Sequence, residues 1–290
     1  MRMRRKAWTE PVLDSCPYFV DRPFAHRGQW RALFPKDRPL HLEIGCGKGL
    51  STVKMAHDNP NVNYIAVDEV RHVLAVSVRN TRVEYGDAPV DNLRYATVDA
   101  MFIHDSFSAQ DGIERIYINF CNPWTERAKH HKRRLTHPRQ LMQYRAFLRP
   151  EGEIWFKTDD DELFAASLRY LAASGFEVVT RIDDLHASGF TPNYVSEHER
   201  LYAARGKPIH FLIARMLSED HVSPEALLAI GGKAPLEDTA DIIPQDLTRL
   251  ERLRSGLGRE VRALLAQSEG QAVPQDGPEK TGDADGRRSP

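Results

Sequence analysis

The sequence predicts a doubly wound α/β fold built on a mostly parallel β-sheet. Short apolar runs alternate with segments of helical periodicity from about residue 41 to residue 216. Glycine and proline stand at many of the junctions between these segments. Strands that alternate with helices are typical of a parallel sheet covered by helices on both faces.

The first half of this pattern contains four expected strands. They are HLEIG (41–45), NYIAVDE (63–69), LRYATVDA (93–100) and RIYINF (115–120). A helix is expected over residues 50–58, where Asn59-Pro60-Asn61 ends it. A second helix follows the second strand and continues through Asn80.

The second half continues the alternation. Pro138 suits the first position of a helix that we expect to end at the turn of residues 149–152. A further helix is expected over residues 161–174, with Gly175 as its stop. The remaining expected strands are EIWFKTD (153–159), FEVVTRI (176–182) and PIHFLIARM (208–216).

The pattern ends at Met216, which divides the chain into a domain of residues 1–216 and an extension of residues 217–290. Within the extension, residues 246–266 could form an amphipathic helix, although Gly256 and Gly258 weaken it. From about residue 269 the composition is that of a disordered tail.

Composition excludes several classes of protein. The 290 residues are 41% hydrophobic and contain no apolar run long enough to cross a membrane. The basic N-terminus lacks the apolar stretch of a secretory signal. Three cysteines without a CxxC pair favour a reducing compartment, which we expect to be the cytoplasm, and no zinc site.

The formal net charge of −1 averages two unlike parts. Residues 217–290 carry 14 acids and 9 bases, which leaves 27 acids and 31 bases in residues 1–216. Basic residues cluster at the N-terminus and again between residues 127 and 139, where Lys132, Arg133 and Arg134 are consecutive. Such clusters bind phosphates, although a solvated helix face explains a charge run equally well.

A glycine loop follows the first expected strand. Gly45, Gly47 and Gly49 are spaced G-x-G-x-G, with Glu43 two residues before the first glycine. Dinucleotide-binding proteins use G-x-G-x-x-G instead, which disfavours a dehydrogenase. A carboxylate beside such a loop favours the ammonium and sulfonium groups of S-adenosylmethionine, whereas a plain tight turn is the alternative interpretation.

Two further acids end the next two strands. Asp68 can accept hydrogen bonds from both ribose hydroxyls of a nucleoside, and Asp99 can accept one from an adenine amino group. Either acid alone could be a solvated strand end. Together with the glycine loop, they favour a nucleoside-containing cofactor at the carboxyl edge of the sheet.

The motifs closely resemble those of the bacterial tRNA (guanine-N7)-methyltransferases. The matching segments are MRMRRKAW, HLEIGCGKG, NYIAVDE, DNL with VDA (91–93 and 98–100), YINFCNPW, HKRRLTHP, FKTDD, and Asn193 with residues 196–199, all within residues 1–216. The resemblance implies the Rossmann-like fold of class I S-adenosylmethionine-dependent methyltransferases. It also implies methyl transfer to N7 of a guanine in tRNA, at position 46 of the variable loop.

The resemblance assigns roles to individual residues. It implies Asn122 and Asp159 as catalytic residues and a cofactor site made of Glu43, Gly45, Gly47, Asp68, Asp99 and Asn122. It implies substrate contacts by Glu126, Asp159, Ser196, Glu197, His198 and Glu199, beside the basic Lys132, Arg133 and Arg134. No residue is assigned to a metal ion.

Two positions depart from the family pattern. Asn122 stands where members carry an aspartate, and Thr125-Glu126 replaces a Pro-Lys pair. A carboxylate at position 122 would stabilise the positive charge that develops on the guanine ring. The neutral residue therefore either limits the rate or belongs to a site that has adapted to it.

Two other functions fit parts of the sequence. Asn-Pro followed by an aromatic residue is similar to the N-P-P-Y type motif of enzymes that methylate exocyclic amines of nucleic-acid bases. A catalytically silent tRNA-binding protein is the second alternative. Oligomeric state, monomer or homodimer, stays open.

Overall fold

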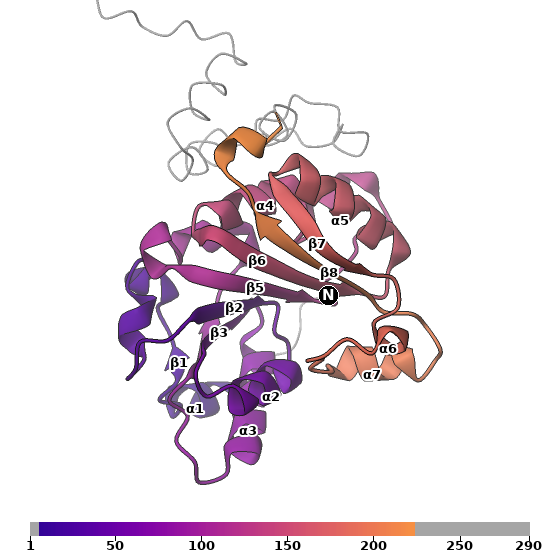
Figure 1. Cartoon of the computed structure of the whole chain (residues 1–290). Helices are drawn as coiled ribbons and strands as arrows, with labels where there is room; N and C mark the ends of the chain where they lie inside the picture. The colour runs from indigo at the N-terminus through magenta and orange to yellow at the C-terminus, as the bar shows by residue number, and fades with distance from the viewer. Residues whose placement is uncertain (1–5, 224–290) are drawn as a thin grey trace, which may run out of the picture.

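The computed structural model describes residues 6–223, which form an eight-stranded sheet (Figure 1). The strands are β1 (Phe19–Val20), β2 (Leu40–Ile44), β3 (Asn63–Asp68), β4 (Leu93–Thr97), β5 (Ile113–Asn119), β6 (Leu148–Thr158), β7 (Phe176–Ile182) and β8 (His210–Met216). Their spatial order is β1-β4-β3-β2-β5-β6-β8-β7. Among these strands, β8 alone runs opposite to the others, so the predicted mostly parallel sheet is confirmed.

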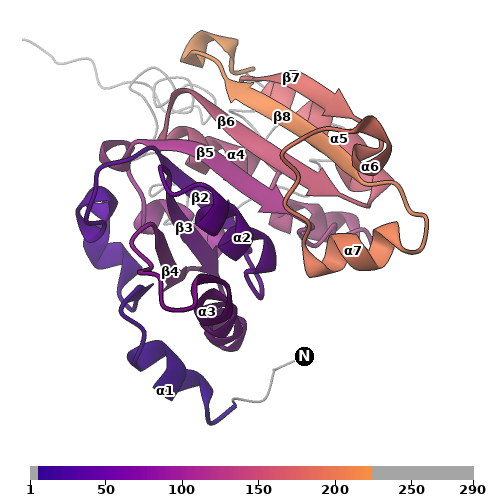
Figure 2. The same cartoon turned by 60° about the horizontal axis from the view of Figure 1, so that its bottom comes forward.

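Helices cover both faces of this sheet (Figures 1 and 2). On one face lie α1 (Thr9–Asp14), α2 (Leu50–Asp58) and α3 (Arg71–Tyr85), and on the other lie α4 (Pro138–Arg145) and α5 (Asp161–Ala173). The short α6 (Leu185–Ser188) and α7 (Glu197–Ala203) join the first face, beside β8. Short 3-10 turns lie at Pro23–His26, Trp30–Leu33, Ala100–Asp105, Ala109–Asp111, Ala128–Arg133 and Glu219–His221.

Alternation along the strands separates two cores. In β6, Ile154 and Phe156 are fully buried in the core beneath α4 and α5. Trp155 and Lys157, on the opposite face, line a small cavity between α2 and the segment that contains α6. This is the period of two that a strand dictates. The face beneath α4 and α5 is apolar, whereas the face toward α2 and α7 carries polar side chains.

The boundary between α4 and β6 differs from the prediction. The helix ends at Arg145 instead of continuing to the turn of residues 149–152, and β6 begins at Leu148. Leu148 pairs with Ile113 of β5, and the register shifts before Glu153 pairs with Arg115. Glu151 has a positive φ of 60°, so the predicted turn is an irregularity inside a long strand.

Three further elements differ from the expectation at the edges of the fold. The helix α1 and the two-residue strand β1, which pairs with β4, carry no clear sequence signal. The helix α3 reaches Tyr85 instead of Asn80.

Beyond Met216, the described chain folds back onto the domain through the bridge between Ser174 and Val222. The predicted helix over residues 246–266 and the predicted tail from about residue 269 lie outside the described residues. In residues 6–223 no helix has the length and apolar character needed to cross a membrane.

Candidate active site at the carboxyl edge of the sheet

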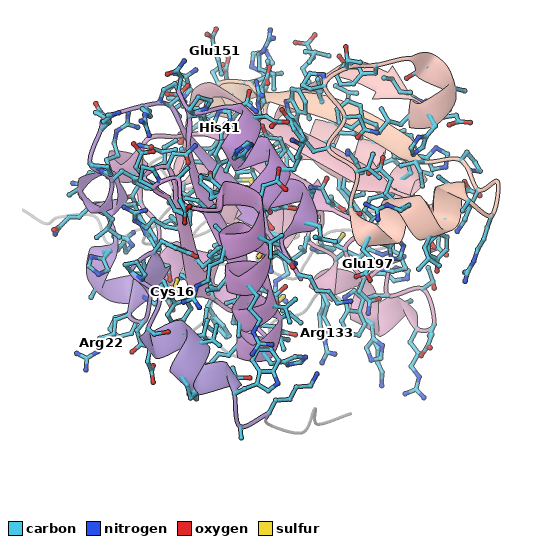
Figure 3. The ribbon with its side chains drawn as sticks, turned by 90° about the horizontal axis from the view of Figure 1, so that it is seen from below. Cys16, Arg22, His41, Arg133, Glu151 and Glu197 are labelled. Carbon is cyan, nitrogen blue, oxygen red and sulfur yellow. The ribbon has the colours of Figure 1, made fainter. Side chains whose placement is uncertain are left out.

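A cleft of about 740 Å³ lies at the carboxyl ends of β2, β3, β4 and β5. Figure 3 shows Arg133, which lines this cleft, and Glu197 well away from Glu151, which lies at the upper edge of that view. The candidate site residues in its lining are Gly45, Asp68, Asp99, Asn122, Lys132 and Arg133. The carboxyl edge of an open parallel sheet is where ligands bind in this fold class.

The glycine loop is a rigid turn between β2 and α2. Gly45, Gly47 and Gly49 have φ of 78°, 55° and 69°, a region that favours glycine. A Cβ at Gly49 would lie 2.8 Å from the Cβ of Ser77, so this position has no room for a side chain. At Gly45, which faces the cleft, the nearest atom would be 3.9 Å away, on Leu135.

Asp68 joins this loop to the end of β3. Its carboxylate accepts hydrogen bonds from the backbone N–H of Gly47 at 3.0 Å and of Val70 at 2.9 Å. Burial raises the pKa of Asp68, and the two backbone hydrogen bonds oppose that shift. A carboxylate has about four acceptor sites, so these two bonds leave capacity for the hydroxyls of a ribose.

Asp99 has a similar double role at the end of β4. It is the N-cap of the following 3-10 turn, and its side chain accepts from the backbone N–H of Met101 at 2.8 Å. The same side chain belongs to the lining of the cleft. The cap therefore holds an acceptor at the end of the cleft nearest β4.

Glu43 lies beneath the loop and is not among the residues that line the cleft, and its contact with the cofactor stays a prediction. The residue is 2% exposed, and its carboxylate accepts hydrogen bonds from Thr52, from Ser51 and from Asn119 Nδ2, the last at 2.9 Å. Burial raises the pKa of Glu43, while the bonds from Thr52 and Asn119 lower it. Glu43 thus attaches the start of α2 to β5.

Asn122 begins the loop that follows β5. Its Oδ1 accepts from the backbone N–H of Trp124 at 3.0 Å, and Trp124 has a positive φ of 51°. The Arg133 guanidinium lies 5.0 Å from the centre of the Trp124 ring, a cation–π distance. Glu126 is exposed on the same loop.

Arg134 is separated from its two basic neighbours. Its side chain is fully buried, donates from Nε to the carbonyl of Pro123 at 2.7 Å, and pairs with Glu162 at 2.5 Å. Lys132 and Arg133, in contrast, line the cleft. The phosphate contact expected of Arg134 does not fit this burial; its side chain holds the loop after Asn122 against α5.

A second group of candidate residues surrounds Asp159, at the end of β6. Its carboxylate accepts from Lys207 Nζ at 2.8 Å and contacts His198 Nε2 at 3.1 Å. Burial raises the pKa of Asp159, but the bonds from Lys207 and His198 outweigh it and hold this pKa below its usual value. The His198 ring lies 4.9 Å from the Phe120 ring and 4.3 Å from the Tyr202 ring, between centroids.

The four residues at the start of α7 have different environments. Ser196 is the N-cap and accepts from the backbone N–H of Glu199, while Glu197 is exposed and pairs with Lys48 of the glycine loop at 2.7 Å. Glu199 is fully buried and pairs with Lys157 at 3.2 Å. The motif therefore contains both surface residues and an interior anchor.

Asn119 and Lys157 connect these groups, although neither belongs to a predicted site. They are register partners at the ends of β5 and β6. The sequence does contain a signal for Lys157, because it is a lysine inside an apolar strand. Lysine is rarely buried without a partner, so such a position indicates a paired charge. Within residues 6–223, no group of three or more His, Cys, Asp or Glu side chains is arranged to hold a metal ion.

Comparison with known proteins assigns the family. The family described as putative methyltransferase matches residues 37–212. The tRNA (guanine-N(7)-)-methyltransferase of Clostridium botulinum (strain Eklund 17B) is 46% identical over 216 residues, which cover 74% of this chain and 98% of that protein. The enzyme of that name from Acetivibrio thermocellus is also 46% identical, with coverages of 74% and 99%.

The chain belongs to the tRNA (guanine-N7)-methyltransferase family. Its sheet and covering helices are the Rossmann-like fold of class I S-adenosylmethionine-dependent methyltransferases. The region matched by the family model ends at residue 212, near the end of β8.

Proposed function

We propose that this protein transfers the methyl group of S-adenosylmethionine to N7 of a guanine in tRNA, at position 46 of the variable loop. Family membership supports the reaction. The observation that carries the proposal is the cleft itself, which has acids at the ends of β3 and β4 and a basic rim formed by Lys132 and Arg133. The acids at the strand ends fit a nucleoside cofactor, and the basic rim fits a phosphate-rich substrate.

The cleft has the size and the donor set that the cofactor needs. Its volume of about 740 Å³ is within the usual range for small-molecule sites. In our proposal Asp68 accepts from the ribose hydroxyls, Asp99 accepts from the adenine amino group, and Gly45 and Gly47 allow close approach of the amino-acid part. Glu43 contributes its negative charge from below the loop. The cofactor supplies an electrophilic methyl group on a positively charged sulfur.

The protein's task in the chemical step is alignment and charge stabilisation. Guanine N7 has a free lone pair, so no proton has to be removed before it is methylated. Alignment of two reactants can supply roughly 7–11 kcal/mol of rate enhancement. We assign alignment of the guanine to Asn122 and Asp159, and Asp159 also offers a carboxylate, although Lys207 offsets part of its charge.

For the tRNA, we assign phosphate contacts to Lys132 and Arg133, which reach the cleft. Glu197 and His198, exposed at the start of α7, extend the substrate surface, and Ser196 and Glu199 shape it from within. The exposed Glu126 would repel a phosphate, so its contact with the tRNA, which stays a prediction, would have to be with a base or a sugar. Because Cys16, Cys46 and Cys121 are all free thiols, we place the enzyme in the reducing cytoplasm.

The direct test is incubation of the protein with unmodified tRNA and methyl-labelled S-adenosylmethionine, followed by nucleoside analysis. We expect label in 7-methylguanosine. Label in a base methylated on an exocyclic amine would support an enzyme of the N-P-P-Y type. Cofactor binding without methyl transfer would indicate a silent tRNA-binding protein.

The cofactor assignment is tested at Asp68. Replacing it with alanine removes two charge-assisted hydrogen bonds and should weaken S-adenosylmethionine binding by roughly 2–4 kcal/mol, measured by calorimetry, with tRNA affinity unchanged. Asp68→Asn keeps an acceptor for the Gly47 N–H, so it separates loss of ribose contact from loss of loop order. Wild-type affinity in both variants would exclude a ribose contact by Asp68.

A further inference from the structure

A buried lysine on β6 holds the segment that leads into α7. The Lys157 ammonium donates to Asn193 Oδ1 at 2.5 Å, to the carbonyl of Tyr194 at 3.1 Å and to Glu199 Oε2 at 3.2 Å. An ammonium group has three donors, so these three contacts use all of them. Asn193 also donates to Glu199 Oε1 at 2.7 Å, which closes the network.

The same lysine is joined to the cofactor side of the molecule. Asn119 is its register partner on β5, and Asn119 Nδ2 donates to Glu43, which in turn holds Thr52 of α2. Glu43 and Glu199 are 2% and 0% exposed, and both act electrostatically on Lys157. One buried cation therefore lies between an acid of the glycine-loop motif and an acid of the α7 motif.

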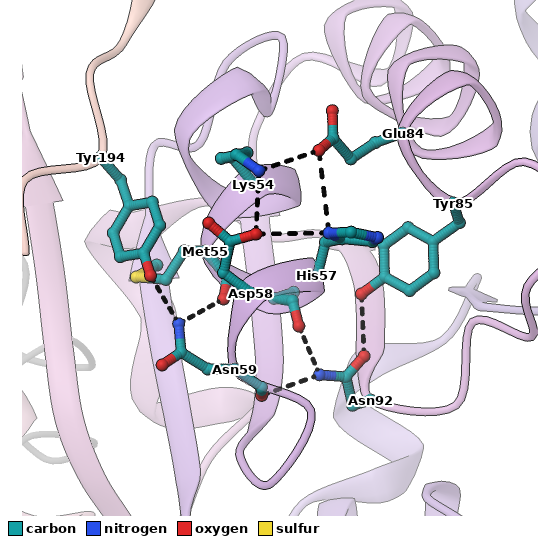
Figure 4. Close-up of polar contacts among 10 residues, drawn as sticks. Lys54, Met55, His57, Asp58, Asn59, Glu84, Tyr85, Asn92 and Tyr194 are labelled. Atoms are coloured by element: carbon teal, nitrogen blue, oxygen red, sulfur yellow. Dashed lines mark hydrogen bonds and ion pairs between the residues drawn. The ribbon is translucent and has the colours of Figure 1, made fainter.

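Two other contacts connect the same two parts closer to the surface. Lys48 of the glycine loop pairs with Glu197, and Asn59 at the end of α2 donates to the hydroxyl of Tyr194 at 2.8 Å (Figure 4). The end of α2 is itself fixed, because the Asn92 amide donates to the carbonyls of Ala56 and Asn59. The segment before α7 is thus attached to a rigid neighbour.

Of these connections, only that of Lys157 is buried and charged. The side chains of Lys48 and Glu197 are about half exposed, at 51% and 53%, and an exposed pair contributes little to geometry or stability. The Lys157 side chain is 10% exposed and its partner Glu199 is fully buried. A buried, fully hydrogen-bonded network specifies a single arrangement of the elements that it joins.

We propose that Lys157 is a positioning residue for methyl transfer, which sets the distance between the cofactor loop and the start of α7, where the exposed Glu197 and His198 are assigned to the tRNA surface. This inference rests on the proposed function. Lys157 acts through Glu199 and Asn193 and has no contact with the reactants. Since a misplacement of about 1 Å can cost roughly a hundredfold in rate, a small movement of α7 is sufficient to slow transfer.

The test compares Lys157→Met with Arg115→Met. Arg115 is a matched control because it lies on the same face of the sheet, pairs with Glu153 at 3.0 Å and, within residues 6–223, makes no hydrogen bond or ion pair with residues 193–199. We expect the single-turnover rate of Lys157→Met, at saturating cofactor and tRNA and per folded molecule, to fall about 100-fold. The tRNA dissociation constant should change less than about threefold, and Arg115→Met should keep a rate within about threefold of wild type.

Lys157→Arg keeps the positive charge beside the two acids. This variant therefore keeps the test usable if Lys157→Met does not fold. A guanidinium cannot place one nitrogen against three acceptors, so we expect a rate roughly tenfold below wild type. The proposal is overturned if the variants that fold transfer methyl groups at the wild-type rate per folded molecule. It is also overturned if the only effect is a raised KM for S-adenosylmethionine. Wild-type protein that forms no 7-methylguanosine would instead refute the proposed function.

Discussion

The two faces of the central sheet belong to the same strands but differ in chemistry. On β6, Ile154 and Phe156 pack under α4 and α5, while Trp155 and Lys157 point toward α2 and the segment before α7. Neighbouring strands repeat the difference, with Leu42 on the first face and Glu43 on the second. One face is an apolar core, and the other combines an apolar cluster beneath α1, α2 and α3 with a layer of aromatic rings and hydrogen-bonded polar groups around Lys157.

We infer that the two faces contribute differently: the apolar face mainly stabilises the fold, and the polar face mainly positions the helices around the site. An apolar face gains free energy from burial without demanding one particular partner for each atom. A polar face gains less, but each buried donor or acceptor on it needs its partner, so it selects one arrangement of α2 and α7. The candidate active site lies at the carboxyl edge, where both faces end.

The largest expected effect is on the apolar face. Phe156→Ala should lower the free energy of unfolding by about 3–5 kcal/mol, because the side chain is fully buried and lies against Phe164. Urea denaturation measures this loss, and the rate of methyl transfer per folded molecule should stay unchanged. Trp155→Ala should cost clearly less, since its ring borders a cavity of about 130 Å³. Equal losses at the two positions would contradict the distinction between the faces.

A smaller effect is expected at Arg134, a basic residue with a structural environment. Arg134→Ala should destabilise the protein by about 3 kcal/mol, since it removes the hydrogen bond to the Pro123 carbonyl and leaves a cavity. The salt dependence of tRNA binding should not change.

The control for Arg134→Ala is the double variant in which Lys132 and Arg133 are both replaced by alanine. Here we expect unchanged stability and an altered salt dependence of tRNA binding. Its stability should remain within about 0.5 kcal/mol of wild type. The slope of log affinity for tRNA against log salt should flatten by about 0.7–0.9 for each phosphate that the protein no longer neutralises. An unchanged slope would mean that both side chains are only solvated.

A pH effect of intermediate size is expected from the polar face. Burial, with help from Arg115 and Arg149, lowers the pKa of His41 from 6.5 to about 3. The unfolded chain therefore takes up this proton first, so stability is complete above about pH 6.5 and falls as the pH drops toward 3. At pH 5 the loss from His41 should be about 2 kcal/mol. Urea denaturation at pH 7 and pH 5 should show a smaller difference for His41→Asn than for wild type, and equal differences would exclude this role.

The smallest expected change concerns Asn122. The charged residues that share its cleft lining are three bases, Lys132, Arg133 and Arg139, and three acids, Asp68, Glu69 and Asp99, while Glu126 and Asp159 are not among them. An aspartate at this position would keep the acceptor for the Trp124 N–H and add negative charge near the guanine. We therefore expect Asn122→Asp to raise the single-turnover rate about tenfold, or about 1.4 kcal/mol, without changing tRNA affinity. A gain seen only together with Glu126→Lys would show that the two positions are coupled.

The central strands could be predicted from the sequence within a few residues. β2, β3 and β4 are apolar runs because a parallel strand is buried on both sides, and that signal is local. β1 and the first residues of β6 could not be predicted, because they become strand only by pairing with β4 and β5. Such pairing depends on residues distant in the chain, which a local pattern does not contain.

The candidate site divides in the same way. Residues expected at the ends of strands, such as Asp68, Asp99 and Asn122, do line one cleft, because strand order and direction place them at a shared edge. The burial of Glu43 and Glu199 could not be foreseen, since it depends on which side chains pack around them.

The sequence alone determined the fold class and the edge of the sheet that carries the cofactor motif, because periodicity, glycine spacing and strand-end acids are local properties of the chain. The family followed from the resemblance of the motifs. The tertiary structure decided which charges reach solvent and which are paired inside. Arg134 stands in a run of basic residues and Lys157 in an apolar strand, and neither context tells which acid the side chain meets, yet both are buried beside specific acids. Whether a charge is available to a ligand depends on desolvation and on its partners, and both arise only when distant segments pack together.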